Sequence, residues 1–272
     1  MDNSVAPAGR QFQSGRRRRF FLIMLPLLLG STPAVSQVQT SEAVAPADAR
    51  PRPVLSLSDS LAAVRISEAA AGDPRRRIVV SLGDRRLFLM ERADTLLSAP
   101  IAVGSGEVLQ HDGQSWDFST PRGRRNVLRK VANPVWVPPD WHYVELARRW
   151  GWRIARLGAA KSATLADGSR LTVRGRHVVR IHKDGRTNQL PSDQEIVIDG
   201  TLFIPPVGTR NREIREELGR YKLDLGDGYL LHGTPHHDSI GQAATHGCLR
   251  LRDADIEYLF EHAPVGTSVY IY

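Results

Sequence analysis

The 272-residue sequence contains a single cysteine, Cys248. No disulfide can form within the chain, and a zinc finger held by cysteine ligands is excluded. The sequence also lacks a long hydrophobic run, because its most apolar stretch covers only residues 20–29. That is about half of the roughly 20 residues that a membrane-spanning helix needs. With no internal repeat either, the composition predicts a globular protein of one domain with tails.

Positive charge is concentrated at the N-terminus. Four arginines at 16–19 precede the apolar run, and the small residues 34–36 follow it. This pattern is typical of a secretory signal peptide over residues 1–36. An uncleaved membrane anchor is the alternative, and the arginines also resemble a twin-arginine export signal.

The net charge of +8 falls to +4 without residues 1–36, with 32 basic and 28 acidic residues left. No basic run is interleaved with aromatic residues, which argues against nucleic acid as a partner. Once the signal is cleaved, we expect no integral membrane domain.

Residues 37–75 are rich in Ala, Pro and Ser and contain no Trp, Tyr or Phe. Such a composition predicts a flexible linker, with one short helix around 58–71. The linker is either a spacer that reaches toward the cell wall or a featureless start of the mature chain.

Residues 76–272 are long enough for one well-buried core. Strand patterns recur along them with turn signals between, which predicts a mainly β domain with a few short helices. Helices are expected at 140–150, 212–219 and 254–262, with Asp140 and Asp253 as N-caps of the first and third. The strand candidates are 77–82, 85–91, 97–103, 125–131, 170–181, 195–204, 228–232 and 268–272.

The chemistry concentrates in residues 230–251, which hold four of the nine histidines and the only cysteine. A thiol attacks as its thiolate, so a nucleophilic cysteine needs a neighbouring base or positive dipole. His232 and His246 are both candidates for that base. An extended backbone puts His246 and Cys248 on the same side. Gly247 between them allows a conformation in which the amides of Gly247 and Cys248 face an oxyanion.

Other readings of these residues are open from the pattern alone. A lone cysteine is often an inert buried residue. A zinc site is a second alternative, since the histidines and the cysteine of this segment are all zinc-ligand types. It leaves Gly247 and Arg250 without a role. His236 and His237 fit a solvated loop. The zinc alternative would use His232, His236, His246 and Cys248.

The histidine and cysteine segment resembles the signature of the L,D-transpeptidase catalytic domain, also called the YkuD domain. Further landmarks follow in the family's order: an opening hairpin at 86–89 and 100–104, a Thr-Pro-x-Gly-like turn at 119–123, and the stretch 133–139. The resemblance therefore runs from about residue 77 to 272. The signature residues are His232-Gly233-Thr234, Ile240-Gly241 and Thr245-His246-Gly247-Cys248-Leu249-Arg250-Leu251.

The resemblance implies a mainly β catalytic domain, of β-sandwich-like or mixed-sheet type, at residues 76–272. It makes Cys248 the nucleophile and His232 the general base, oriented by a backbone carbonyl. Arg250 is expected to meet a substrate carboxylate, because a guanidinium can bind one in bidentate fashion. No cofactor or metal is implied. The thiol pocket and oxyanion site would be shaped by Gly233, Thr245, His246 and Gly247.

The implied substrate is a peptidoglycan stem peptide in the periplasm. Its third residue would form a thioester with the cysteine and release D-alanine. An amine of a neighbouring stem, or of an outer-membrane lipoprotein, would then take the acyl group. Alternatives are an L,D-carboxypeptidase or another hydrolase on the same scaffold and, less in keeping with an intact signature, a silent wall-binding module. Residues 141–194 and 205–211 depart from the family pattern and put acceptor choice in doubt.

Overall fold

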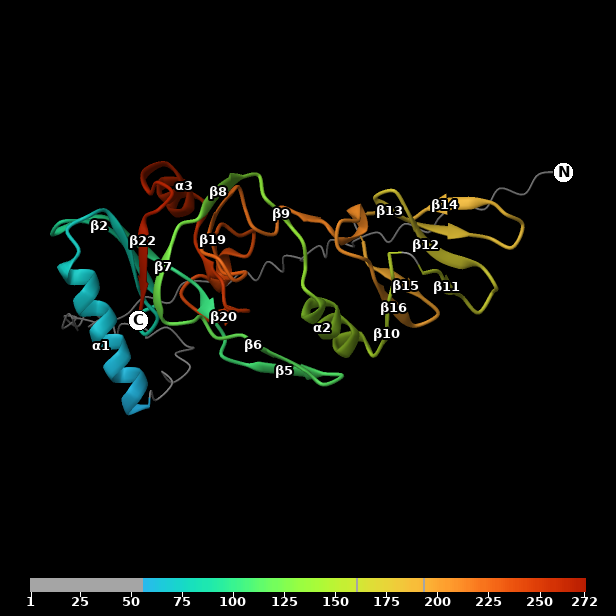
Figure 1. The fold of residues 1–272 in the computed structure, drawn as a ribbon, viewed down its shortest axis with the longest axis horizontal. Helices are drawn as coiled ribbons and strands as arrows, with labels where there is room; N and C mark the ends of the chain where they lie inside the picture. Colours follow the sequence, from blue (N-terminus) through green and yellow to red (C-terminus); the bar gives the residue numbers. More distant parts are fainter. Residues whose placement is uncertain (1–55, 160, 193) are drawn as a thin grey trace, which may run out of the picture. The chain divides into compact units, whose positions relative to one another are not determined.

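The computed structural model describes residues 56–159, 161–192 and 194–272 (Figure 1). The expected signal peptide and residues 37–55 of the expected linker lie outside this part. Contacts divide the chain into two units, 1–50 and 51–272, and every described residue belongs to the second. Within the described ranges, no helix has both the length and the apolar character to cross a membrane.

A five-stranded sheet with the order β3-β2-β1-β22-β7 forms one side of the core. Its central strands β1 and β22 pair in parallel, so the last strand of the chain lies beside the first strand of the domain (Figure 1). The remaining pairs are antiparallel. The strands are β1 (Arg77–Ser81), β2 (Arg86–Glu91), β3 (Asp94–Pro100), β7 (Gly123–Asn126) and β22 (Ser268–Ile271).

The central strand β1 is buried along its whole length because both faces of the sheet are covered. Ile78 and Val80 enter the main core. Val79, on the opposite face, packs with Tyr270 of β22 and with Ala70 of helix α1 (Leu57–Gly72). The short helix expected near the end of the linker is therefore present, and it packs on the sheet. The domain boundaries themselves stay predictions.

A four-stranded sheet with the order β21-β19-β18-β8 shares that core. Leu223, Leu231 and Leu249 from this sheet join the main cluster, together with Ile256 and Leu259 of helix α3 (Asp253–His262). All five are at most 1% exposed. The prediction of a mainly β fold with a few short helices is thus confirmed. The strands are β8 (Arg129–Ala132), β18 (Tyr221–Asp224), β19 (Leu230–His232) and β21 (Leu249–Arg250).

Between β9 (Val135–Trp136) and β17 (Ile214–Arg215) the chain forms helix α2 (Asp140–Trp150) and two small sheets, β10-β16-β15 and β11-β12-β13-β14. Leu171, Val178 and Phe203 belong to a separate apolar core in this segment. Tyr143 of α2 packs with Leu202 of β16. We call residues 153–204 the inserted segment. Its strands are β10 (Arg153–Arg156), β11 (Ala163–Thr164), β12 (Arg170–Arg174), β13 (His177–Ile181), β14 (Thr187–Gln189), β15 (Ile196–Ile198) and β16 (Thr201–Ile204).

Several expectations for secondary structure were wrong. The strands expected at 97–103 and 125–131 are each divided between two strands of different sheets, the first between β3 and β4 (Val103–Gly104) and the second between β7 and β8. The strands expected at 170–181 and 195–204 are both hairpins, which turn through residues of positive φ such as Gly175 and Gly200. The helix expected at 212–219 is a single 3-10 turn, η1 (Arg210–Arg212), followed by strand β17 (Ile214–Arg215).

The buried guanidinium of Arg212 explains the missing helix. It donates to the carbonyls of Pro138 and Pro205 and pairs with Asp140, which ties this stretch to the start of α2. Asp140 is the first residue of α2 rather than its N-cap, which is Pro139. Asp253 is likewise the first residue of α3 rather than its N-cap.

One buried hydroxyl joins three segments of the core. Thr120 accepts the N–H of Gly104 at 2.8 Å and donates to the carbonyl oxygen of Gly247 at 2.9 Å. Gly104 has no room for a side chain, because a Cβ there would lie 2.2 Å from the Phe118 carbonyl oxygen. The remaining short pairs are β4 (Val103–Gly104) with β20 (Ala243–Thr245), β5 (Val108–His111) with β6 (Gln114–Asp117), and β9 (Val135–Trp136) with β17; the second 3-10 turn is η2 (His237–Ser239).

We expect Thr120→Val to lower the free energy of unfolding by about 2 to 4 kcal/mol, because two buried backbone groups lose their partner at about 1–3 kcal/mol each. The matched control is Thr95→Val, on an exposed position of β3, which should change stability by less than about 0.5 kcal/mol. Urea unfolding measures both. Equal midpoints for the two variants would contradict this role of Thr120.

Candidate active site

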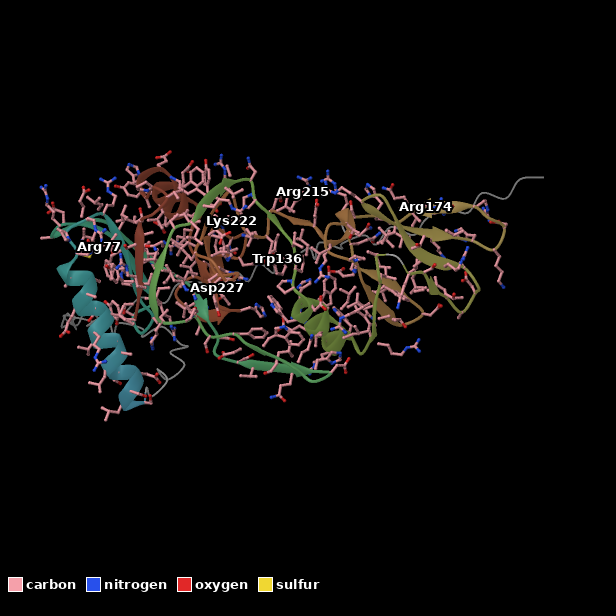
Figure 2. The ribbon with its side chains drawn as sticks, viewed as in Figure 1. Arg77, Trp136, Arg174, Arg215, Lys222 and Asp227 are labelled. Carbon is pink, nitrogen blue, oxygen red and sulfur yellow. The ribbon has the colours of Figure 1, made fainter. Side chains whose placement is uncertain are left out.

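Side chains of β18, β19 and β21 that point away from the core gather on one face of the four-stranded sheet. The parallel register sets His232 opposite Arg250. Cys248 precedes Arg250 by two residues and shares its face, because side chains alternate along an extended chain. Lys222 of β18 lies opposite His232 in the antiparallel register (Figure 2). Cys248, His232 and Arg250 together line a cavity of about 370 Å³.

Cys248 presents a partly exposed thiol to this cavity. Its Sγ lies 3.7 Å from the carbonyl oxygen of Gly228. Burial raises the pKa of the thiol, and this outweighs the backbone hydrogen bond from Leu230 and the positive charges of Arg250 and Lys222, which lower it. The resting thiol is therefore protonated at neutral pH, so attack requires a base.

His232 is a buried imidazole with a defined orientation. It is 4% exposed, and its Nδ1 lies 2.6 Å from the carbonyl oxygen of Gly233. A carbonyl only accepts, so we assign the proton to Nδ1 and the free lone pair to Nε2. Burial lowers the pKa of His232 to about 4, the Gly233 bond partly opposes this, and the positive Arg250 and Lys222 lower it further. The ring is thus neutral at pH 7 and able to accept a proton.

His246 forms one wall of the cavity and is held by helix α2. Its Nε2 lies 2.9 and 3.0 Å from the two carboxylate oxygens of Glu145. The ring stacks on Trp141, with centroids 4.0 Å apart and 16° between the planes, and meets the edge of Phe118 at 4.5 Å. Three contacts therefore fix the orientation of His246. Because its Nε2 is taken by Glu145, His232 is the better placed of the two candidate bases.

Arg250 lies beside an acidic residue that it does not bind closely. Its Nη2 is 3.8 Å from Glu217, and its buried Nε has no hydrogen-bond partner among the described residues. The guanidinium therefore keeps donors for an incoming carboxylate. His236 is exposed, as expected of a loop residue, and its Nε2 lies 3.4 Å from the other oxygen of Glu217 at the cavity rim.

The loop before the cysteine is held by its own hydrogen bonds. The hydroxyl of Thr245 donates to the carbonyl of Cys248 at 2.6 Å and accepts the N–H of Gly247 at 3.2 Å. Of the two amides expected to face an oxyanion, that of Gly247 is therefore engaged within the loop. Gly247 has φ +109° and no room for a Cβ beside Tyr229. Gly233 is also closely packed, because a Cβ there would lie 2.9 Å from Oδ1 of Asp253.

Several residues of the site were not found from the sequence. Trp141 and Glu145 are four residues apart, so they share one face of α2, and that spacing was a usable signal. Glu217 and Lys222 had no such signal, since 212–219 was expected as a helix and β18 was not expected as a strand. In the described ranges, no group of three or more His, Cys, Asp or Glu side chains is placed to hold a metal ion.

We expect the burial of His232 to make stability depend on pH. Its pKa is about 4 in the folded chain and about 6.5 when unfolded. The unfolded state therefore binds more protons between these values, and stability is lost as pH falls from about 6.5 to 4. The loss is about 3 kcal/mol. Urea unfolding at pH 7.5 and pH 4 should show a loss smaller by about this amount in His232→Gln than in the unchanged chain.

The control for this measurement is His237→Gln, at an exposed position, which should keep the pH dependence of the unchanged chain. If His232→Gln lost as much stability between pH 7.5 and pH 4 as the unchanged chain, a neutral, buried His232 would be contradicted.

The chain matches the family model described as the L,D-transpeptidase catalytic domain, YkuD, over residues 75–271. It is 37% identical over 87 residues to the protein named probable L,D-transpeptidase ErfK/SrfK of Salmonella typhimurium strain LT2, which covers 27% of this chain and 28% of that protein. It is 26% identical over 202 residues to the protein named probable L,D-transpeptidase YcfS of Escherichia coli K12, covering 73% of this chain and 44% of that one. The chain spans less than half the length of these relatives.

Solved structures of the same name resemble the chain more distantly. An L,D-transpeptidase from Xylanimonas cellulosilytica is 15% identical with a TM-score of 0.39, covering 74% of this chain and 62% of that one. The catalytic domain of the E. faecium L,D-transpeptidase is 12% identical with a TM-score of 0.36, covering 74% of this chain and 99% of that one. Because the family model matches most of the chain, including strand β19 with His232 and the loop with Cys248, the chain belongs to the L,D-transpeptidase catalytic domain family.

Proposed function

We propose that the protein is a peptidoglycan L,D-transpeptidase that forms a thioester between Cys248 and the third residue of a stem peptide, then passes the acyl group to an amine. One observation carries the proposal. A neutral imidazole, held at Nδ1 by the Gly233 carbonyl, lines the same cavity as the only thiol of the chain. This is the pairing of base and nucleophile that thiol acyl transfer requires.

In the first half of the reaction, Sγ of Cys248 attacks the carbonyl carbon and Nε2 of His232 takes the thiol proton. Since the imidazole is a weak base and the thiol a weak acid here, the proton moves as the carbon–sulfur bond forms. The negative oxygen of the tetrahedral intermediate accepts from the amide of Cys248. Collapse breaks the peptide bond, His232 returns the proton to the leaving nitrogen, and D-alanine departs.

In the second half, an acceptor amine attacks the thioester carbon and gives a proton to His232. Sγ leaves as thiolate and recovers that proton, so the product is a new amide and the thiol is restored. Arg250 positions the peptide through a carboxylate, for which it has unused donors. Water in place of the amine would yield a hydrolase, so the wall formed by Trp141, Glu145 and His246 has to favour the amine.

Export to the periplasm is part of the proposal. It rests on the arginines at 16–19 and the apolar run at 20–29, which lie outside the described residues. The acceptor is an amine of a second stem peptide or of an outer-membrane lipoprotein.

Incubation with disaccharide tetrapeptides, followed by mass analysis, tests the reaction. We expect loss of D-alanine together with peptide-linked dimers, and no turnover by Cys248→Ala at an unchanged unfolding midpoint. Release of alanine without dimers would replace the transpeptidase by a carboxypeptidase. Full activity of Cys248→Ala would exclude the thiol mechanism.

The roles of the two nearby histidines are expected to differ. His232→Ala should lower kcat by about 100-fold or more, the contribution of a general base, whereas His236→Ala at the exposed rim should change it only a few-fold. With a pKa of about 4 for His232, the base stays unprotonated on lowering the pH from 7 to 5.5. We therefore expect no loss of kcat/KM from its protonation in that range. This assignment would be contradicted if kcat/KM halved near pH 6.5 and if His232→Ala left kcat unchanged.

A further inference from the structure

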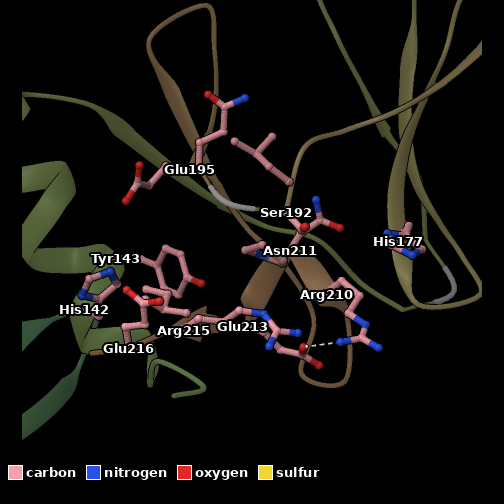
Figure 3. Close-up of a pocket in the computed structure, with 14 residues that line it drawn as sticks. His142, Tyr143, His177, Ser192, Glu195, Arg210, Asn211, Glu213, Arg215 and Glu216 are labelled. Carbon is pink, nitrogen blue, oxygen red and sulfur yellow. Dashed lines mark hydrogen bonds and ion pairs between the residues drawn. The ribbon is translucent and has the colours of Figure 1, made fainter. Parts of the chain in front are cut away.

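A second cavity, drawn in Figure 3, shares lining residues with the catalytic one. Its volume is about 670 Å³, within the roughly 300–1,000 Å³ common for ligand sites. Its walls come from α2, from β13 and β15 of the inserted segment, and from η1 and β17. His142 and Ile214 line both cavities. A substrate that extends from Cys248 past these two residues therefore enters the second cavity.

The second cavity carries unpaired charges of both signs. Glu195, Glu216 and Arg215 line it, and none of their side chains has an ion-pair or hydrogen-bond partner in the part of the chain that the structure describes. Other charges there are already neutralised, because Glu213 is paired with both Arg176 and Arg210. The free charges thus suit a ligand that brings both a carboxylate and an ammonium group.

Two more polar groups in this wall lack partners among the described residues. The Tyr143 hydroxyl points into the cavity (Figure 3), although the side chain is only 5% exposed. Burial raises the pKa of Tyr143 to about 12, so the hydroxyl stays a donor at neutral pH. Nδ1 of His177 is buried with no hydrogen-bond partner. Buried polar groups are nearly always bonded, so the unpartnered Nδ1 of His177 points to a polar ligand or to water. The Tyr143 hydroxyl, which faces the cavity, offers a further donor.

We propose that the second cavity binds a peptide segment carrying both a carboxylate and an ammonium group, with Arg215 on the carboxylate and Glu195 and Glu216 on the ammonium. The inference rests on the proposed function. In a stem peptide, the side-chain end of diaminopimelate has this chemistry. This side-chain end belongs either to the stem that acylates Cys248 or to the acceptor stem, and the cavity would bind it through the same contacts in both cases. The inserted segment thereby gains a role in choosing substrates.

Binding can be measured without turnover in the Cys248→Ala protein. The probes are a disaccharide tetrapeptide with diaminopimelate and the same molecule with lysine, which lacks the side-chain carboxylate. We expect the diaminopimelate form to bind about tenfold tighter or more, as a charge-assisted bond to Arg215 allows. Adding Arg215→Ala should abolish this preference, and adding Glu195→Gln should weaken both probes.

Matched controls are Arg65→Ala and Glu68→Gln, at exposed positions of α1, whose residues do not line the cavity. Both should leave the two affinities unchanged. Equal affinity for the two probes, a preference that survives Arg215→Ala, or no binding of either probe would overturn the site. Failure of the unchanged chain to turn over tetrapeptides would instead count against the proposed function, since the titration does not depend on it.

Kinetics of the Arg215→Ala protein with intact Cys248 distinguish the two sources. A higher KM for D-alanine release without added acceptor assigns the cavity to the acylating stem. Unchanged release with a lower yield of dimers assigns it to the acceptor stem. Unchanged values in both assays, together with unchanged affinity in the titration, would reject the proposal.

Discussion

The parallel pairing of β19 with β21 determines both the core and the site. Leu231 lies beside Leu249 on the face toward the core, and His232 lies beside Arg250 on the other face. Side chains alternate with a period of two, so a slip of one residue would expose the leucines and bury the polar groups. The apolar packing that stabilises this part of the fold therefore also holds the imidazole and the thiol in one cavity.

Burial has opposite effects on the pKa values of the two groups that we propose to react. It favours the uncharged form of each, so the pKa of His232 falls and that of Cys248 rises. Arg250 and Lys222 oppose a positive imidazole and favour a negative sulfur. The resting site is thus a neutral pair near two positive groups, in which negative charge on sulfur or on a substrate oxygen is the charge that the surroundings stabilise.

Helix α2 connects the catalytic loop with the inserted segment. Trp141 and Glu145 hold His246, while Tyr143 packs on β16 and faces the second cavity. The buried Arg212 ties the start of this helix to η1 through Asp140. Helix α2 thus supplies one wall of the candidate active site and, together with β13 and β15 of the inserted segment, part of the adjoining cavity.

Much of the domain was evident from local sequence. The β-branched run at 77–82 and the apolar residues within 228–232 predict strands. A histidine and a lone cysteine in the signature 232–251 predict thiol chemistry. The hairpins at 170–181 and 195–204 were missed because their turns interrupt otherwise continuous strand patterns. The helix expected at 212–219 failed because a tertiary contact, the burial of Arg212, outweighed local propensity.

The sequence by itself determined which residue types are available: one thiol, the histidines around it, and a glycine at 247, where the backbone can adopt conformations that other residues disfavour. The tertiary structure alone decided which of them meet. Glu145 lies 101 residues from His246 in the chain, and Thr120 lies 127 from Gly247. Such contacts depend on strand register and on helix packing across the whole domain, and no local pattern of residues encodes them. The same holds for the lowered pKa of His232, which follows from burial and from the charges of Arg250 and Lys222. The tautomer, in contrast, is set by the carbonyl of the next residue in the chain, Gly233.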